Sequence, residues 1–475
     1  MPAKALWTTQ ELVAATGGEL LGAINVPMSG VSIDSRSIAA GDIFLAIKGD
    51  AHDGHAFAAQ ALKAGAGVAV VSRVDEAMLA AGPVLHVVDP LQSLGAMGRA
   101  ARQWNVGRSI AVTGSVGKTS TKEMLRIALS TSGKTHASAA SFNNHWGVPL
   151  TLARFPRDAV FGVFEIGMNH GGEITPLVDM VQPHVAIITT IAASHLGNFK
   201  SLDEIAEAKA EIFSGVVYGG VAVINRDTPF FELLSRRATE QGIRKIISFG
   251  AHIDSDVRLR QVVLHPTCSC ISADVMGEAV TFKLGTPGRH MGLNSLSVLA
   301  AVKCVGADLA RASLALSEAK PPKGRGGQEL LQLQSGDVLL LDESYNANPQ
   351  SMAAALELLV TAAKSRKGRR IAVLGDMLEL GEFSSDLHRS LARDLDKAKI
   401  DSLYAAGPMM KHLWDNVAGS QQGAYAEVST ALIDRLAANL RGGDSVVIKG
   451  SLGSKMGAVA DALRQRFAVA QKEGV

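Results

Sequence analysis

The segment Ile110–Ser120 constrains the fold of this chain more than any other part of the sequence. It opens with three apolar residues, passes through Gly114 and Gly117, and reaches Lys118-Thr119 just before a helical pattern begins. Glycines allow backbone N–H groups to approach phosphate oxygens, the lysine can reach the β and γ phosphates, and the threonine hydroxyl can ligate Mg²⁺ at a helix N-terminus. The segment therefore predicts a strand, a phosphate-binding loop and a helix in that order.

The spacing of this loop is Gly-x-x-Gly-Lys-Thr, because Val112 occupies the position at which an ordinary P-loop has a further glycine. A tight strand-to-helix turn also needs glycine, so a purely structural role is the alternative. The apolar stripe that follows favours phosphate binding, because it supplies the helix that the mechanism requires. We expect the nucleotide to be bound by Gly114, Ser115, Val116, Gly117, Lys118, Thr119 and Ser120.

The composition excludes several classes of protein. A chain of 475 residues suggests about three domains, and a net charge of +2 gives no global field for nucleic acid or an acidic membrane. Cys268, Cys270 and Cys304 lack a Cys-x-x-Cys spacing and fit a reducing compartment. No stretch approaches the roughly 18 apolar residues of a membrane helix. We therefore expect a cytoplasmic protein that binds neither nucleic acid nor membranes, and we expect it to be a monomer.

Breaks in the pattern divide the chain into three predicted α/β domains. Residues 1–89 form a small unit that ends at Asp89-Pro90, a dipeptide typical of a chain exit. Residues 90–320 alternate strands with helices, which indicates a parallel sheet with helical crossovers, and only 254–282 suggest shorter, antiparallel strands. The prolines and glycines of Lys320–Gly327 mark a linker or hinge. Residues 321–475 form the third domain.

Two polar side chains follow strands of the predicted central sheet. Glu165 ends the apolar run Val160–Phe164, and His195 comes shortly after Ile187–Ile191. Ligands of open parallel sheets gather beyond the carboxyl ends of the strands, so both side chains can face the nucleotide. A carboxylate and an imidazole beside phosphates suggest Mg²⁺ ligands, although magnesium prefers oxygen. A capped strand end and a hydrogen-bonded loop histidine are the structural alternatives.

Lys209 lies on the apolar face of a predicted helix, together with Leu202 and Phe213. A lysine in this position either extends its amine to solvent or loses its charge through desolvation. A neutral amine can react with CO₂ to give a carbamate, which is an anionic oxygen ligand. We therefore hypothesise that Lys209 is carbamylated and supports a Mg²⁺ ion.

Two further pairs of residues offer polar groups in weaker patterns. Asn143 and Asn144 precede Gly147–Leu150 and are also typical of an Asx turn before a helix. His290 and Asn294 are four residues apart and lie on one face of a predicted helix, where an adenine could be held.

Taken together, these segments resemble the ATP-dependent Mur ligase family of peptidoglycan synthesis in all three predicted domains. The short phosphate loop, the two asparagines, Glu165 with Asn169–Ile174, and Ala208-Lys209 resemble the central ATPase domain of that family. Three further segments resemble the N-terminal UDP-binding module of that family: Val31–Arg36, Gly41–Phe44, and Lys48-Gly49 with Asp53-Gly54-His55. The resemblance implies a central P-loop domain with a parallel sheet and a C-terminal Rossmann-like domain.

The resemblance also assigns roles to individual residues. It implies ATP and Mg²⁺ as cofactors, with Lys118, Glu165, His195 and Lys209 as catalytic residues and with Mg²⁺ near Thr119, Glu165, His195 and the carbamate. It implies that Arg325 and Asp342 contact the ATP phosphates and ribose, with His290 and Asn294 on the adenine side. The candidate substrate contacts are Asp34, Ser35, Arg36, Lys48, Asn143, Asn144, Asn346 and Asn348.

The third domain narrows the expected reaction. Asp342–Pro349 and Leu374–Gly381 resemble the family members that join D-alanyl-D-alanine to UDP-N-acetylmuramoyl-tripeptide through an acyl phosphate. Relatives that add glutamate, diaminopimelate or lysine carry different residues after the corresponding strand. The alternatives are amino-acid addition to the UDP-muramoyl-dipeptide, and a P-loop ATPase that hydrolyses ATP without joining anything.

Overall fold

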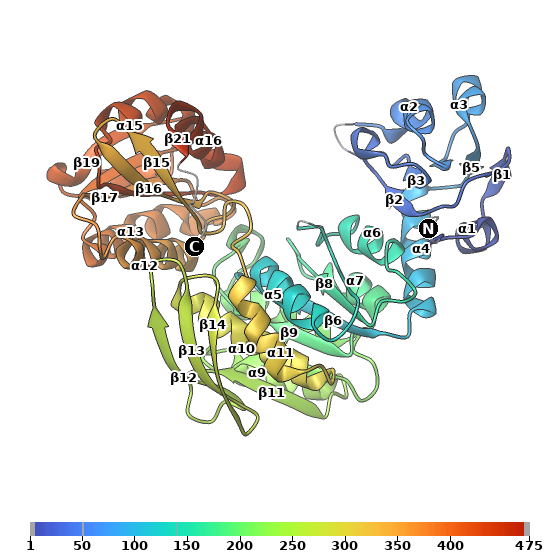
Figure 1. The fold of residues 1–475 in the computed structure, drawn as a ribbon, viewed down its shortest axis with the longest axis horizontal. Coiled ribbons are helices and arrows are strands. Elements are labelled where there is room, and N and C mark those ends of the chain that lie inside the picture. Colours follow the sequence, from blue (N-terminus) through green and yellow to red (C-terminus); the bar gives the residue numbers. More distant parts are fainter. Residues whose placement is uncertain (1–4, 50–51, 140, 470–475) are drawn as a thin grey trace.

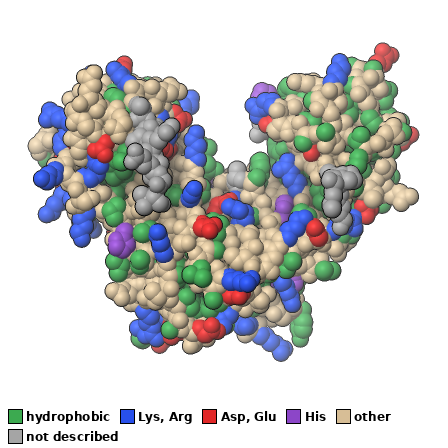
Figure 2. Space-filling view, viewed as in Figure 1, with side chains coloured by type: hydrophobic (Ala, Val, Ile, Leu, Met, Phe, Trp, Pro, Cys, Tyr) green, Lys and Arg blue, Asp and Glu red, His purple; other side chains and the backbone are tan. Residues whose placement is uncertain are grey.

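The computed structural model describes residues 5–49, 52–139 and 141–469. Within these residues the chain forms three sheets, and Figure 1 shows them in a V, with the central sheet at the base and the N-terminal and C-terminal sheets in the two arms. Figure 2 shows the notch between the arms in space-filling form. The expected α/β class is confirmed. Within the described ranges, no helix has the length and apolar character needed to cross a membrane.

The N-terminal arm holds a five-stranded sheet. Its strands are β1 (Glu19–Leu21), β2 (Gly30–Ser32), β3 (Asp42–Leu45), β4 (Val68–Val71) and β5 (Val84–His86), and its helices are α1 (Thr9–Thr16), α2 (Ala58–Lys63) and α3 (Glu76–Ala81), with the short turns η1 (Ser35–Ser37) and η2 (Gly54–Phe57). The order is β1-β5-β4-β3-β2, and only β1 runs antiparallel to its neighbour. A reciprocal capping box of Thr8 and Glu11 starts α1, and Gly17, at φ 67°, ends it.

Two helices join this arm to the central domain. They are α4 (Pro90–Trp104) and α6 (Gly147–Ala153), and their apolar residues enter the core of the first sheet. The Trp7 indole donates to the Ala153 carbonyl (2.9 Å), and the Arg154 guanidinium donates to the Val31 carbonyl (2.6 Å). The domain boundary after residue 89 stays a prediction. Helix α4 begins at the next residue and packs against both the N-terminal and the central domain.

The central sheet places the phosphate loop. Its strands are β6 (Arg108–Thr113), β7 (Thr135–Ala137), β8 (Phe161–Glu165), β9 (Val185–Ile188), β10 (Val221–Asn225), β11 (Lys245–Gly250), β12 (Val257–Leu264), β13 (Ser269–Val275) and β14 (Glu278–Leu284). The order is β14-β13-β12-β11-β10-β9-β6-β8-β7. The chain builds β7 and β8 on one side of β6 and β9 to β11 on the other. The carboxyl end of β6 is therefore a topological switch point, the usual ligand site of an open α/β sheet.

Helices cover both faces of this sheet. They are α5 (Lys118–Ser130), α7 (Ile174–Val181), α8 (Leu202–Ala210), α9 (Phe231–Glu240), α10 (Arg289–Cys304) and α11 (Leu309–Ala315), with the turns η3 (Leu196–Asn198), η4 (Glu211–Phe213) and η5 (Leu316–Glu318). The strands β12 to β14 pair antiparallel, as the sequence predicts. The prediction that they are shorter is wrong, since they span 8, 7 and 7 residues. Packing of α10 on one face allows long strands with one exposed face.

The C-terminal arm holds a seven-stranded sheet. Its strands are β15 (Gly327–Leu333), β16 (Gly336–Glu343), β17 (Arg370–Gly375), β18 (Ser402–Ala406), β19 (Gln422–Ala426), β20 (Ser445–Lys449) and β21 (Ala468–Val469). Its helices and turns are α12 (Pro349–Ala362), η6 (Gly381–Phe383), α13 (Ser384–Ala398), α14 (Met410–Trp414), η7 (Gly419–Gln421), η8 (Ser429–Leu432), α15 (Ile433–Asn439), η9 (Leu452–Ser454) and α16 (Met456–Arg466). The order β19-β18-β17-β20-β16-β15-β21 sets the parallel strands β16, β20 and β17 side by side, so their carboxyl ends meet.

Candidate active site

The phosphate loop is held in shape by the segment that follows β9. Gly114 (φ 145°) and Gly117 (φ 91°) take backbone angles that favour glycine, and a Cβ on Gly114 would lie 2.0 Å from the Thr189 hydroxyl oxygen. That hydroxyl donates to the Val116 carbonyl (2.6 Å), and the Ser115 hydroxyl donates to a backbone carbonyl beyond β9 (2.9 Å). The loop is therefore fixed by its neighbours, and its glycines are required by close approach as well as by φ.

Lys118 begins α5 and turns back onto its own loop. Its ammonium donates to the Gly114 carbonyl (2.5 Å). Burial lowers the pKa of Lys118 to about 8, Glu165 opposes that shift, and Arg325 adds to it. The ammonium therefore sits where a phosphate oxygen could replace the carbonyl as its acceptor.

Glu165 ends β8 and is 1% exposed. Its Oε1 accepts from the Thr119 hydroxyl (3.1 Å) and from the Asn143 amide (2.8 Å). Its Oε2 is buried and has no hydrogen-bond partner among the described residues. A buried carboxylate oxygen without a partner is costly, so this side chain fits a site that holds a cation.

Lys209 lies in α8 and is 1% exposed, so the alternative in which its amine extends to solvent is wrong. Burial, with a further contribution from Lys118, holds its pKa well below the usual value. Among the described residues no hydrogen bond or ion pair reaches its amine. This environment favours the neutral amine that carbamate formation requires.

His195 lies directly before η3 in the left-handed region, at φ 58°, and lines the same cavity. Burial lowers its pKa most, Glu379 raises it, and both Lys118 and Lys209 lower it further, which brings these side chains into one electrostatic neighbourhood. Within the described ranges, no group of three or more His, Cys, Asp and Glu residues could hold a metal ion. A Mg²⁺ site here would therefore also need the Thr119 hydroxyl and a modified Lys209.

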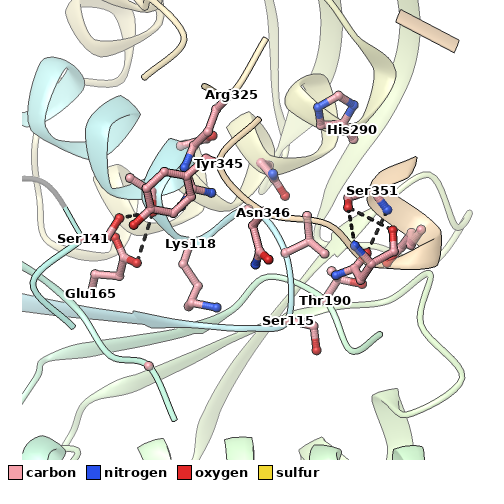
Figure 3. A pocket seen from close by; sticks show the side chains of 18 of the residues that line it. Ser115, Lys118, Ser141, Glu165, Thr190, His290, Arg325, Tyr345, Asn346 and Ser351 are labelled. Carbon is pink, nitrogen blue, oxygen red and sulfur yellow. Dashed lines mark hydrogen bonds between the residues drawn. The ribbon is translucent and has the colours of Figure 1, made fainter. Parts of the chain in front are cut away.

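A cavity of about 410 Å³ lies between the central and C-terminal domains. Figure 3 shows Lys118 and Glu165 from the central domain together with Arg325, Asn346 and Ser351 from the C-terminal side. The Arg325 guanidinium stacks 4.1 Å over the ring of Tyr345. The linker and the first loop of the third domain thus bring cationic and polar groups to the phosphate loop.

The two residues predicted for the adenine side lie in α10 and both line the cavity. Asn294 packs against the phosphate loop itself, since a Cβ on Gly117 would lie 2.5 Å from its amide nitrogen. His290 is closer to the C-terminal domain: burial lowers its pKa, Glu343 raises it and Lys449 lowers it. Their role toward adenine stays a prediction.

Asp342 does not line the cavity in this structure. Its carboxylate accepts from the Ser344 hydroxyl (2.6 Å) and pairs with Arg464 (2.8 Å), whereas the next residue, Glu343, lines the cavity. The predicted contact of Asp342 with ATP stays a prediction. Arg464 lies in α16, 122 residues away along the chain, so no local sequence pattern could predict this ion pair.

The asparagines predicted to contact the substrate include residues with structural hydrogen bonds and residues that line the cavity. Asn144 accepts from the Trp146 and Gly147 amides (3.2 and 3.0 Å), which confirms the predicted Asx turn before α6. Asn348 caps α12 in a capping box with Ser351, and Asn346 and Asn348 both line the cavity.

The N-terminal candidates lie in the other arm of the V. Asp34 and Arg36 pair with each other (2.7 Å), and the Arg36 contacts lower the pKa of Asp34 to about 2. Ser35 begins η1, and Lys48 forms an isolated β-bridge with Asp53. None of the four candidates lines the cavity at the phosphate loop. A second cavity of about 930 Å³ lies between α4 and α7, on the N-terminal side of the first.

Lys449 is a site residue that the sequence reasoning missed. It ends β20, is 2% exposed, lines the cavity, and donates to the Asn346 carbonyl (2.8 Å) beside Glu343 (3.5 Å). Burial lowers its pKa and Glu343 opposes the shift. The strand-end rule that located Glu165 would also have found this lysine.

This fold and site define a three-domain Mur ligase, and the chain belongs to the Mur ligase family. Residues 27–102 match the family model described as Mur ligase family, catalytic domain; residues 112–302 match the Mur ligase middle domain; and residues 329–452 match the Mur ligase, glutamate ligase domain.

Individual relatives are similar over nearly their whole length. The UDP-N-acetylmuramoyl-tripeptide--D-alanyl-D-alanine ligase of Escherichia coli (strain K12) is 35% identical over 462 residues, which covers 96% of this chain and 98% of the relative. The ligase of the same name from Bacillus subtilis (strain 168) is 31% identical and covers 90% and 91%. A crystal structure of MurF from Acinetobacter baumannii has a TM-score of 0.84 at 31% identity and covers 98% of this chain and 100% of that chain.

Proposed function

We propose that this chain joins D-alanyl-D-alanine to the terminal carboxylate of UDP-N-acetylmuramoyl-tripeptide, with conversion of ATP to ADP and phosphate, in peptidoglycan synthesis. The observation that carries the proposal is the cavity in which the phosphate loop faces Lys449 and Asn346. A ligase must bring an activated carboxylate to an amine. Here the central domain contributes the phosphate loop for activation of the carboxylate, and the C-terminal domain contributes Lys449 and Asn346 for the amine substrate. The relatives named for this step support the choice of substrates.

The chemistry requires activation because a carboxylate is charged and lacks a leaving group. Transfer of the γ-phosphoryl group to the tripeptide carboxylate gives an acyl phosphate and ADP. Attack by the neutral amine of the dipeptide gives a tetrahedral intermediate, which expels phosphate as the amide forms and the amine proton is lost. Lys118 would neutralise charge on the transferred group, and the surrounding loop would position it.

The magnesium ligands of the proposal are the Thr119 hydroxyl, Glu165, His195 and the Lys209 carbamate. The unpaired, buried Glu165 Oε2 supports this assignment. When bound, Mg²⁺ would supply positive charge at the phosphate oxygens. The carbamate forms when the neutral Lys209 amine attacks CO₂ and releases one proton, which replaces a buried neutral amine by an anion.

The C-terminal domain supplies the dipeptide side of the proposal. Lys449 offers a buried ammonium, and the positive end of the α12 helix dipole lies at the same cavity, which Asn346 and Asn348 line. Both features favour an anion, and D-alanyl-D-alanine carries one carboxylate. We therefore assign the dipeptide carboxylate to Lys449 and the UDP moiety to Asp34, Ser35, Arg36 and Lys48. The cytoplasmic location and the monomeric state stay predictions.

The test is phosphate release by the purified protein with MgATP. The proposal expects release only when UDP-N-acetylmuramoyl-tripeptide and D-alanyl-D-alanine are both present, with the pentapeptide product seen by mass spectrometry. Lys118→Ala should lower turnover at least about 100-fold while binding of the UDP substrate persists. Release that needs neither substrate would instead indicate a non-ligating ATPase. Product formed from the UDP-muramoyl-dipeptide and free diaminopimelate or lysine would indicate another step of the family.

A further inference from the structure

Two loops from different domains form what we call the interdomain clasp, defined as His195–Asn198 of the central domain and Glu379–Phe383 of the C-terminal domain. The Gly197 N–H donates to the Glu379 carbonyl (2.8 Å). The backbones approach so closely that a Cβ on Gly381 would lie 2.8 Å from the Gly197 Cα. The clasp therefore depends on glycine in both loops.

Apolar residues anchor both halves of the clasp. Leu196 is 8% exposed and Leu380 is 1% exposed, and both belong to one hydrophobic cluster that spans the two domains. Burial of this kind is worth more than a surface contact, because apolar area is removed from water on both sides. The loops are therefore docked, and they contribute to the way in which the two domains meet.

The two residues that face each other across the clasp have unusual backbones. His195 has φ 58° and Glu379 has φ 63°, in the left-handed region that residues other than glycine rarely adopt. Such conformations persist only when the surroundings fix them, and they gather at functional sites. Here their result is a direct contact between His195 Nδ1 and the Glu379 carboxylate.

We propose that Glu379 is a positioning residue that holds the His195 imidazole from the C-terminal domain, so that its free ring nitrogen faces the metal–nucleotide site only while the clasp is closed. The inference rests on the proposed function for the role of His195 at that site. It assigns a role to the Glu379 side chain, which does not line the cavity and takes no part in the reaction steps described above.

The chemistry of metal-binding histidine supports this arrangement. An imidazole that ligates a metal through one nitrogen usually directs its other N–H to a carboxylate or carbonyl, which fixes the ring orientation and the tautomer. In this chain the carboxylate belongs to a different domain from the imidazole. Domain docking and metal–nucleotide affinity should therefore be coupled through a single side-chain pair.

The test measures Mn²⁺·ADP binding by electron paramagnetic resonance, which does not depend on turnover. Glu379→Ala should weaken Mn²⁺·ADP binding about tenfold, within the range known for such supporting carboxylates, and Glu379→Gln should weaken it less because it keeps an oxygen acceptor. Glu382→Ala is the matched control, since it removes an exposed carboxylate from the same loop and should leave affinity unchanged. Equal melting temperatures would establish that all variants fold.

A double-mutant cycle distinguishes positioning from a separate contribution. Once His195→Ala has been made, Glu379→Ala should cause no further loss of Mn²⁺·ADP affinity. A loss that persists in the His195→Ala background, or wild-type affinity in Glu379→Ala alone, would overturn the inference. If His195→Ala itself has no effect, the metal role of His195 in the proposed function fails as well, so the two failures can be told apart.

Discussion

At the scale of single residues, two lysines determine the electrostatics of the phosphate site. Lys118 and Lys209 are both desolvated, and each lowers the pKa of His195. Two ammonium groups that approach in a buried site repel, and removal of a proton from one of them relieves that repulsion. A carbamate on Lys209 goes further, because it turns the repulsion of Lys118 into attraction.

The Lys209 carbamate can be observed directly. In ¹³C-bicarbonate the wild-type protein should show one slowly exchanging carbamate carbon by NMR, and Lys209→Met should remove that signal. Because the pKa of Lys209 lies well below the usual value, the signal should already be present near neutral pH, and it should disappear on acidification as the amine protonates. Lys455→Met, at an exposed lysine, is the control. A wild-type spectrum without the signal would contradict the hypothesis.

Lys449 provides a second prediction at this scale. Lys449→Met keeps the length of the side chain but removes its charge, and a hydrogen bond to a charged group contributes about 1.5–3 kcal/mol. We expect the KM for D-alanyl-D-alanine to rise about 10- to 100-fold, while the KM for ATP changes little. Steady-state kinetics with the dipeptide and with its C-terminal amide would separate the carboxylate contact from general damage. Equal losses for both compounds would refute the assignment.

The sequence located some of these residues for a physical reason. Glu165 and His195 follow from the rule that ligands gather at the carboxyl ends of parallel strands, and the burial of Lys209 follows from helical periodicity. Both rules use only local sequence. The Asp342–Arg464 pair and the His195–Glu379 contact join residues that are far apart in the chain, so no local pattern could predict them.

At the scale of elements, the position of the phosphate loop depends on β6, which lies at the switch point, and on the segment after β9, which holds the loop. Alternation of strands and helices predicts the parallel core of this sheet. The lengths of β12 to β14 could not be predicted in the same way, because they depend on the cover that α10 gives to one face. Element type therefore follows from local pattern, whereas element length depends on tertiary packing.

The packing of β7 against α6 predicts a loss of stability in acid. His136 donates from Nε2 to the Thr151 carbonyl (2.8 Å), and burial lowers its pKa to about 4 from 6.5. Between these pH values the unfolded chain binds a proton that the folded chain does not, so the free energy of unfolding falls as the pH falls from about 6.5 to 4. The full effect is on the order of 3 kcal/mol.

Urea unfolding across this pH range would measure that effect. His136→Gln keeps an N–H donor without a titrating ring, so its free energy of unfolding should fall less steeply than that of the wild type. His86→Gln, at an exposed histidine of β5, should follow the wild-type curve. Parallel curves for wild type and His136→Gln would show that His136 does not drive the loss.

At the scale of the whole molecule, the open V poses a geometric problem for the proposed reaction. The residues assigned to UDP lie in one arm, whereas the cavity that holds Lys118 and Lys449 lies where the central domain meets the other arm. The second cavity, between α4 and α7, shares Asn144 and Asn169 with the first and so extends toward the N-terminal arm. A UDP-linked tripeptide would have to span this distance, and water must be excluded from an acyl phosphate.

Small-angle X-ray scattering should therefore show compaction when both ligands are bound. We expect the radius of gyration to fall when UDP-N-acetylmuramoyl-tripeptide and a non-hydrolysable ATP analogue are added together, because the tripeptide links the N-terminal arm to the phosphate site. UDP with the same analogue is the matched control and should leave the V open, since it lacks the peptide that reaches the cavity. Full compaction with UDP and the analogue would mean that nucleotide contacts close the molecule without the peptide. An unchanged radius of gyration with UDP-N-acetylmuramoyl-tripeptide and the analogue would mean that the V itself is the working arrangement.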